Sequence, residues 1–296
     1  MSEMLHMKTR VVDIETVHAY GCSMAAGHEI THPATLDKLH RIVPVLEGAE
    51  LHSVQRADKR ESFIATVCNN LGVQHINNAA YGHSNEHNAF ILLEDIMKGR
   101  IQRNHAVFFC ITLLTRVMYF DPLNGKPLSR QLHSWAEDSP EILEHYNDYK
   151  MLYNYFLLMQ QIMLMCKSVG APLYFIPMFE HPTWNLMSDY RPYNPDVRKV
   201  EKKIKDEWHF RKVIDLIARE MNGMSLLVPG KIQNCSFLWY TESLNENRDH
   251  KDFHALTKKG IKLREKTHSP GRHPNKYSHD KYAEELTALL KPEKAK

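Results

Sequence analysis

Apolar positions along the chain fall into short continuous runs separated by segments with helical spacing. The run Ala106–Leu114 is apolar at nearly every position, which is typical of a strand covered on both faces of a parallel sheet. Shorter apolar or β-branched segments, several of which end near glycine or proline, have the length of strands. They predict further strands over residues 9–21, 73–76, 172–178 and 225–228.

Between these runs, apolar residues recur three or four positions apart, as on the buried face of a helix. Phe63, Val67 and Leu71 show this spacing, and Gly72 follows them as a stop signal. The same pattern recurs in the middle and near the end of the chain. It predicts helices over residues 61–71, 85–98, 140–168, 198–221 and 277–290.

The order of these elements predicts the fold class. Strands that alternate with helices indicate βαβ units, and hence a parallel sheet with helices on both sides. We therefore predict a three-layer α/β/α sandwich. The chain shows no internal repeat and no Ser/Gly-rich linker, so we expect one domain over residues 1–296 with a core of about 9–290. In such sheets, ligands bind in the loops at the carboxyl ends of the strands.

Composition excludes several protein classes. Hydrophobic residues make up 43% and aromatic residues 9% of the 296 positions, which argues against a disordered chain. The longest apolar run has about half the length that a membrane span needs, and no signal peptide is predicted. The 5 cysteines form no CxxC motif and suggest no disulfide framework. We expect a reducing, cytoplasmic location.

Charge is balanced over most of the chain. The 38 basic and 35 acidic residues give a formal net charge of +3, which does not indicate nucleic acid or an anionic membrane as a partner. From about residue 248 onward the chain is more basic, with 13 lysines and arginines against 7 acidic residues. We interpret this segment as a solvated face. Nucleic-acid binding, whose mark would be a steep salt dependence, is the alternative.

Candidate chemistry follows the predicted strands. Ser23 follows the first strand among small residues, where it fits either a nucleophile or a helix N-cap. Gly82 lies in the loop after the second strand, and its N–H can approach a reacting centre because glycine has no Cβ. His273 precedes Pro274 just before the last predicted helix, where it could serve as a general base.

Four segments in this order resemble the SGNH (GDSL-type) hydrolase family, and most of all its small bacteriophage members. Gly21-Cys22-Ser23 is similar to the nucleophile block, and residues 78–85 resemble the block that supplies an oxyanion glycine. Residues 107–116 resemble the third block in its phage form, in which Thr112 replaces the usual asparagine. His273-Pro274-Asn275, with His279 farther on, resembles the last block.

The resemblance implies a flavodoxin-like α/β/α fold and a serine esterase or deacetylase that needs no cofactor or metal. Ser23 would attack an ester carbonyl, and His273 would accept its proton and return it to the leaving alcohol. The N–H groups of Ser23 and Gly82, helped by the Thr112 side chain, would hold the oxyanion. The implied substrate is a small acyl ester, in particular an acetyl ester on a glycan, and no membrane partner is expected.

The catalytic acid departs from the family pattern. The family places an aspartate two or three residues before the histidine, where this chain has Gly271 and Pro270. Another group could orient His273 in place of the missing aspartate. The candidates are a backbone carbonyl and the carboxylates of Asp249, Asp252 and Asp280. Without an orienting acid, the alternative function is a catalytically silent binding or virion-associated structural protein, and a homo-oligomer is compatible with either function.

Other polar and aromatic side chains are candidates for substrate contact. We expect such contacts from Asn85, Arg116 and Trp184. Arg116 follows a buried strand, where it would bind a substrate carboxylate or sugar oxygen, or pair with a nearby acid. Trp184 would stack on a sugar ring or pack onto the domain. His250 and His254 have the i, i+4 spacing of two metal ligands, but their polar surroundings favour surface histidines, and no metal site is predicted.

Overall fold

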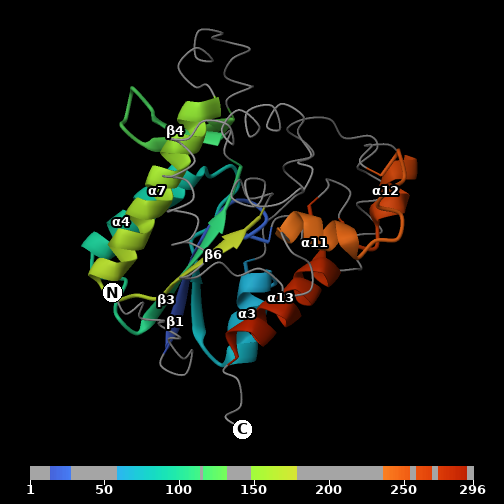
Figure 1. Cartoon of the computed structure of the whole chain (residues 1–296), viewed down its shortest axis with the longest axis horizontal. Helices are drawn as coiled ribbons and strands as arrows, with labels where there is room; N and C mark the ends of the chain where they lie inside the picture. Colours follow the sequence, from blue (N-terminus) through green and yellow to red (C-terminus); the bar gives the residue numbers. More distant parts are fainter. Residues whose placement is uncertain are drawn as a thin grey trace, which may run out of the picture.

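A parallel sheet with helices on both sides forms the centre of the molecule in the computed structural model (Figure 1). The structure describes residues 14–27, 59–113, 116–131, 148–178, 236–253, 258–268 and 273–291. Four described strands form the sheet in the order β2-β1-β3-β6, and every neighbouring pair is parallel. They are β1 (Thr16–Tyr20), β2 (Gln74–Asn77), β3 (His105–Ile111) and β6 (Leu173–Pro177).

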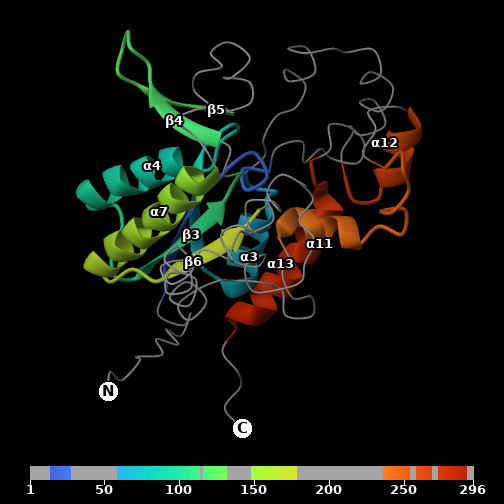
Figure 2. The same cartoon turned by 45° about the horizontal axis from the view of Figure 1, so that its top comes forward.

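Helices cover the sheet in two separate groups (Figures 1 and 2). One face carries α3 (Phe63–Leu71), α11 (Phe237–Ser243) and α13 (Lys276–Leu290). The other carries α4 (Asn85–Met97) and α7 (Asp148–Ser168). The described part of the chain is therefore a three-layer α/β/α sandwich with a central parallel sheet, as the sequence predicts.

Strand β3 explains why its segment is apolar throughout. Alternate side chains of a strand point to opposite faces of the sheet. Ala106, Phe108 and Cys110 join the core cluster under α3 and α13, whereas Val107 and Phe109 join the cluster under α4 and α7. Because both faces are covered, every position from Ala106 to Ile111 is apolar.

The strand order places a topological switch point beside β1. From β1 the chain goes to β2 on one side of it, and then to β3 on the other side. In open α/β sheets, the crevice at such a point, beyond the carboxyl ends of the strands, is where ligands bind. The last residues of β1 lie beside these ends, with Ala19 opposite Asn77 and Tyr20 opposite Phe109.

Several described elements were not predicted from the sequence. A hairpin of β4 (Arg116–Phe120) and β5 (Pro127–Gln131) follows β3 and projects above the sheet edge (Figure 2). Its turn is closed by a hydrogen bond from Gly125 N–H to Asp121 O at 2.8 Å. Helices α11 and α12 (Lys258–Arg264) are also additions. The predicted helix over 198–221 and the strand over 225–228 lie outside the described residues.

Within the described ranges, every helix is too short or too polar to cross a bilayer.

Candidate active site

Ser23 lies in a tight turn directly after β1. The turn is closed by a hydrogen bond from Ala26 N–H to Cys22 O at 3.0 Å. A Cβ on Gly21 would lie 2.7 Å from Cys110 Cβ and 2.8 Å from Ala25 Cβ, closer than real Cβ atoms come. Glycine is therefore what lets the turn pass so close to β3. The Ser23 residue is 7% exposed.

The loop after β2 runs beside this turn and is fixed to it. Asn78 N–H donates to Ala19 O at 2.8 Å, and Ala80 N–H donates to Gly21 O at 3.1 Å. These two bonds continue the β1–β2 pairing beyond the strands. The loop then turns back at Gly82, whose φ of 80° is the conformation that favours glycine. The peptide of Gly82 is thus held near the nucleophile turn.

The backbone N–H groups of Ser23 and Gly82, at the carboxyl edge of the sheet, are suited to bind an anion. Within the described residues, neither Ser23 N–H nor Gly82 N–H donates a hydrogen bond to another group of the protein. Ser23 is buried and Gly82 partly buried, and buried backbone N–H groups are nearly always paired. A pair that stays available beside a serine suits an oxygen that becomes negative during acyl transfer.

His273 reaches Ser23 from the far end of the chain. Its Nε2 lies 2.9 Å from Ser23 Oγ, across 250 positions of sequence. Residues next to His273 are held firmly: Asn275 N–H donates to Thr267 O at 3.0 Å, and Asn275 caps α13 through Ser278 N–H. When Ser23 donates to Nε2, the ring proton of neutral His273 is on Nδ1.

Thr112 directly follows β3 and is held by Asn85. Thr112 N–H donates to Asn85 Oδ1 at 2.8 Å, and Asn85 Nδ2 donates to Thr112 O at 3.1 Å. Both residues are buried. The carboxamide of Asn85 thus fixes the loop after β3 to the first turn of α4, while its contact with a substrate stays a prediction. Thr112 Oγ1 accepts a hydrogen bond from Arg116 Nη1 at 3.4 Å.

The three carboxylates considered as the catalytic acid contact other groups. Asp249 is exposed and lies 3.4 Å from Arg248 Nε. Asp252 pairs with Lys259 at 2.7 Å, and the hydrogen bond from this ammonium group lowers the pKa of the carboxyl. Asp280 pairs with Lys276 and accepts from Thr66 Oγ1 at 3.4 Å. A role for any of them in orienting His273 remains a prediction. Residues 270 and 271 and the candidate Trp184 lie outside the described residues.

Asn77 is a site residue that the sequence analysis did not single out. Its Nδ2 donates to Ala25 O at 2.9 Å, and its Oδ1 accepts from Ala79 N–H at 3.1 Å. One carboxamide therefore joins the nucleophile turn to the loop that carries Gly82. Its position directly after the predicted strand over residues 73–76, next to Asn78, is the sequence signal that could have found it.

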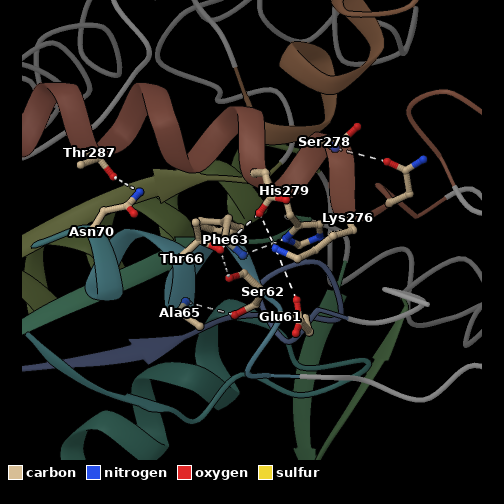
Figure 3. A network of polar contacts seen from close by, with 12 residues as sticks. Glu61, Ser62, Phe63, Ala65, Thr66, Asn70, Lys276, Ser278, His279 and Thr287 are labelled. Atoms are coloured by element: carbon tan, nitrogen blue, oxygen red, sulfur yellow. Dashed lines mark hydrogen bonds and ion pairs between the residues drawn. The ribbon is translucent and has the colours of Figure 1, made fainter. Parts of the chain in front are cut away.

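Two histidines around the site, His83 and His279, have lowered pKa values. Burial, together with the neighbouring His87, lowers the pKa of His83 to about 4. Burial also lowers the pKa of His279, which lies between α3 and α13, to about 3 (Figure 3). His250 lies near Asp252, and residue 254 is not described. The described residues include no group of three or more metal-ligating side chains.

Among known proteins, the chain is similar only to solved structures, and not to any protein family or curated protein by sequence. No protein-family model matches the sequence, and no curated protein matches it. The chain is similar in structure to the psychrotrophic esterase EstA from Pseudoalteromonas sp., with a TM-score of 0.41 and 11% identity over 93% of this chain and 98% of that one.

Two further solved structures show the same level of likeness. A member of the lipolytic protein G-D-S-L family from Veillonella parvula has a TM-score of 0.40 and 9% identity, over 93% of this chain and 95% of that one. A carbohydrate esterase family 2 enzyme from Corynascus thermopiles has a TM-score of 0.43 and 12% identity, over 93% of this chain and 65% of that one. Values this low carry no conclusion about activity, which has to be inferred from the residues of the site.

Proposed function

We propose that this protein is a serine ester hydrolase of the SGNH type, with Ser23 as nucleophile and His273 as general base. One observation carries the proposal: the 2.9 Å contact between Ser23 Oγ and His273 Nε2 at the carboxyl edge of the sheet. A serine next to an imidazole nitrogen is the arrangement that activates a hydroxyl for attack on a carbonyl carbon.

The reaction follows from this geometry in two steps. Ser23 Oγ attacks the ester carbonyl while His273 Nε2 takes the hydroxyl proton, and this proton then goes to the leaving alkoxide as the C–O bond breaks. A water molecule next gives its proton to His273 and attacks the acyl-serine, which releases the carboxylic acid and restores the Ser23 hydroxyl.

The oxyanion of each tetrahedral intermediate would be held by the N–H groups of Ser23 and Gly82. Their availability for a ligand supports this assignment. Thr112 would add a hydroxyl donor where the family has asparagine. Its N–H is already bonded to Asn85, so only the side chain is offered for this role. Removing one oxyanion donor in other serine hydrolases costs roughly 10²–10³ in rate.

The substrate class comes from the resemblance of the four sequence blocks. An acetyl ester on a carbohydrate is the proposed substrate, and a relationship to the small bacteriophage members of the family is proposed. The protein would act in the cytoplasm without a cofactor. Ser23 follows β1, and Gly82 lies in the loop after the neighbouring strand β2, which supports the proposal.

Labelling with a fluorophosphonate tests the nucleophile directly, because the reagent reacts with a serine that a base has activated. We expect the native protein to be labelled, and both Ser23→Ala and His273→Ala to lose the label. Ser168→Ala is the matched control: Ser168 lies at the end of α7, is exposed, and bonds to Met165 O, so its label should equal that of the native protein.

Absence of label on folded native protein would contradict the proposal. The catalytically silent binding or structural module would then be the better hypothesis. Equal labelling of native protein and Ser23→Ala would show that another serine is the nucleophile. Folding is checked for each variant by circular dichroism and by thermal unfolding.

A further inference from the structure

Two cationic side chains flank the turn that carries Ser23. Lys59 is anchored at the end of β2, where its Nζ donates to Asn77 O at 2.8 Å. Arg116 is anchored beyond the end of β3, where its Nη1 lies 3.4 Å from Thr112 Oγ1. Lys59 is thus anchored at the end of β2 and Arg116 beyond the end of β3, and these are the two strands that pair with β1, which ends at the nucleophile turn.

Arg116 also touches the loop after β2. Its Nη1 donates to His83 O at 3.3 Å, directly after Gly82 in sequence. The guanidinium group therefore contacts Thr112 directly and His83, the residue after Gly82, so it lies beside two of the proposed oxyanion residues. Both of its protein acceptors here are neutral oxygens at long distance, and a guanidinium has five N–H donors. Most of its donor capacity is left for a ligand.

Lys59, like Arg116, is partly buried at its charged end and bonds to a neutral oxygen. The residue as a whole is exposed, but partial burial of the ammonium group lowers its pKa. Its acceptor is again a neutral carbonyl oxygen. The charges of Lys59 and Arg116 both lower the pKa of the His83 imidazole. Their effects are smaller than those of burial and of the neighbouring His87. Both charges thus lie around the same short loop.

Carboxylates on the adjacent elements are engaged elsewhere. Glu61 pairs with Lys276 at 3.4 Å, and Asp95 pairs with Arg100 at 2.9 Å. Glu86 accepts a hydrogen bond from a backbone N–H of β4, and burial raises its pKa, which favours its neutral form. In the described part of the chain, no carboxylate forms an ion pair with Lys59 or Arg116.

We infer that the substrate of this site is an ester that carries a negatively charged group, a carboxylate or a phosphate, bound by Lys59 and Arg116. The inference rests on the proposed esterase function. A charged alcohol part keeps the acetyl ester proposed above, whereas a charged acyl part would replace it. Two partly buried cations beside a nucleophile, with no anionic partner among the described residues, raise the local concentration of anionic substrates and orient them through charge-assisted hydrogen bonds. The charged group can belong to the acyl part or to the alcohol part of the ester.

Two matched pairs of esters test the inference and distinguish the two sources. The mono-nitrophenyl ester of adipic acid has a charged acyl part, and its methyl ester is the neutral counterpart. Meta-acetoxybenzoate has a charged alcohol part, and its methyl ester is neutral. For each pair the measured quantity is kcat/KM of the anionic ester divided by that of the neutral one, at low and high ionic strength.

We expect one of the two ratios to exceed about 10 in the native protein, since a hydrogen bond to a charged group is worth about a tenfold or larger effect. Arg116→Gln and Lys59→Gln should each lower that ratio about tenfold, and salt should lower it in the native protein. Lys98→Gln is the control: Lys98 pairs with Glu94 just beyond α4, about 20 Å along the helix axis from its first turn, and should leave the ratio unchanged.

The outcomes separate this inference from the proposed function. Hydrolysis of the neutral esters with both ratios near 1 would overturn the anionic substrate class and leave the esterase in place. A high ratio that survives both Arg116→Gln and Lys59→Gln would overturn the assignment to these residues. No hydrolysis of any of the four esters, together with no fluorophosphonate label on Ser23, would overturn both.

Discussion

His279 Nδ1 accepts a hydrogen bond from Phe63 N–H at 2.9 Å, although the two residues are 216 positions apart in the chain (Figure 3). Phe63 is the first residue of α3, whose first N–H groups lack partners within the helix. Ser62 Oγ accepts from another of them, at Ala65. The imidazole of α13 therefore completes the cap of α3, and this contact requires His279 to be neutral.

Protonation of His279 should destabilise the fold in acid. Burial lowers its pKa from 6.5 to about 3, with smaller contributions from Lys276 and His273. Between these two values the unfolded chain binds one more proton than the folded one, so the free energy of unfolding rises with pH and levels off above about 6.5. The slope is about 1.4 kcal/mol per pH unit for each such group. Burial also lowers the pKa of His18, to about 4, which adds to the slope in the same direction.

Urea unfolding of His279→Gln between about pH 5 and 8 measures this contribution. The variant should be less stable at neutral pH, and its pH slope should be smaller than that of the native protein by about one proton. Asn70→Ala is the control, because it removes a hydrogen bond between α3 and α13 but no titratable group, so it should leave the slope unchanged. An unchanged slope in His279→Gln would mean that His279 is not held neutral by the fold.

The fold could be predicted for those elements whose burial produces a recognisable pattern of apolar residues in the sequence. Strand β3 is covered on both faces, so its apolar run is continuous, and α3 ends at Gly72 in the left-handed conformation that such a stop implies. The β4–β5 hairpin was missed because its strands are partly exposed and include Pro127 and Arg130. A strand that contributes few side chains to the core shows no regular alternation of apolar and polar residues in the sequence.

The candidate site was predictable only in part. Ser23, Gly82 and His273 belong to short motifs, and the structure brings Ser23 and His273 into contact. Contacts made by single polar side chains across the chain have no such signal. Lys59 is a lone lysine in a polar segment, and the bond between Asn85 and Thr112 joins residues 27 positions apart. Pairings of this kind depend on strand order and register, which periodicity alone does not give.

Asn77→Asp should slow catalysis without unfolding the protein. A carboxylate in this position can still accept from Ala79 N–H, but it has no N–H for Ala25 O, and two acceptor oxygens would then face each other. We expect the nucleophile turn to shift and the rate of fluorophosphonate labelling of Ser23 to fall about tenfold, because small misplacements of reacting groups are costly.

Asn70→Asp is the matched control for this variant. Asn70 lies on α3 and donates to Thr287 Oγ1 at 3.3 Å, away from the strand ends (Figure 3). It should leave the labelling rate unchanged. A labelling rate in Asn77→Asp that equals the native rate would show that the turn keeps its position without this carboxamide.

Gly21→Ala should disrupt the nucleophile turn by overpacking. The new methyl group would lie 2.7 Å from the Cβ of the fully buried Cys110 in the middle strand β3, which has no room to move aside. Overpacking of this kind costs typically about 1–3 kcal/mol. We expect a lower thermal midpoint and loss of the Ser23 label. Gly125→Ala on the β4–β5 turn adds a methyl group into open space, so it should keep the label despite its unfavourable φ. Equal labelling of both variants would contradict the close-packing argument.

Asn85→Ala separates a positioning role from a substrate contact. Its carboxamide pairs with both Thr112 N–H and Thr112 O in a buried environment, so the alanine variant would leave two buried backbone groups without partners. The expected loss is roughly 2–4 kcal/mol of unfolding free energy, with a fall in kcat because the loop after β3 loosens. A substrate contact alone would instead raise KM and leave stability unchanged. Asn124→Ala, on the exposed hairpin turn, is the control and should change neither. Urea unfolding and kcat measured on the same preparations decide between the two roles.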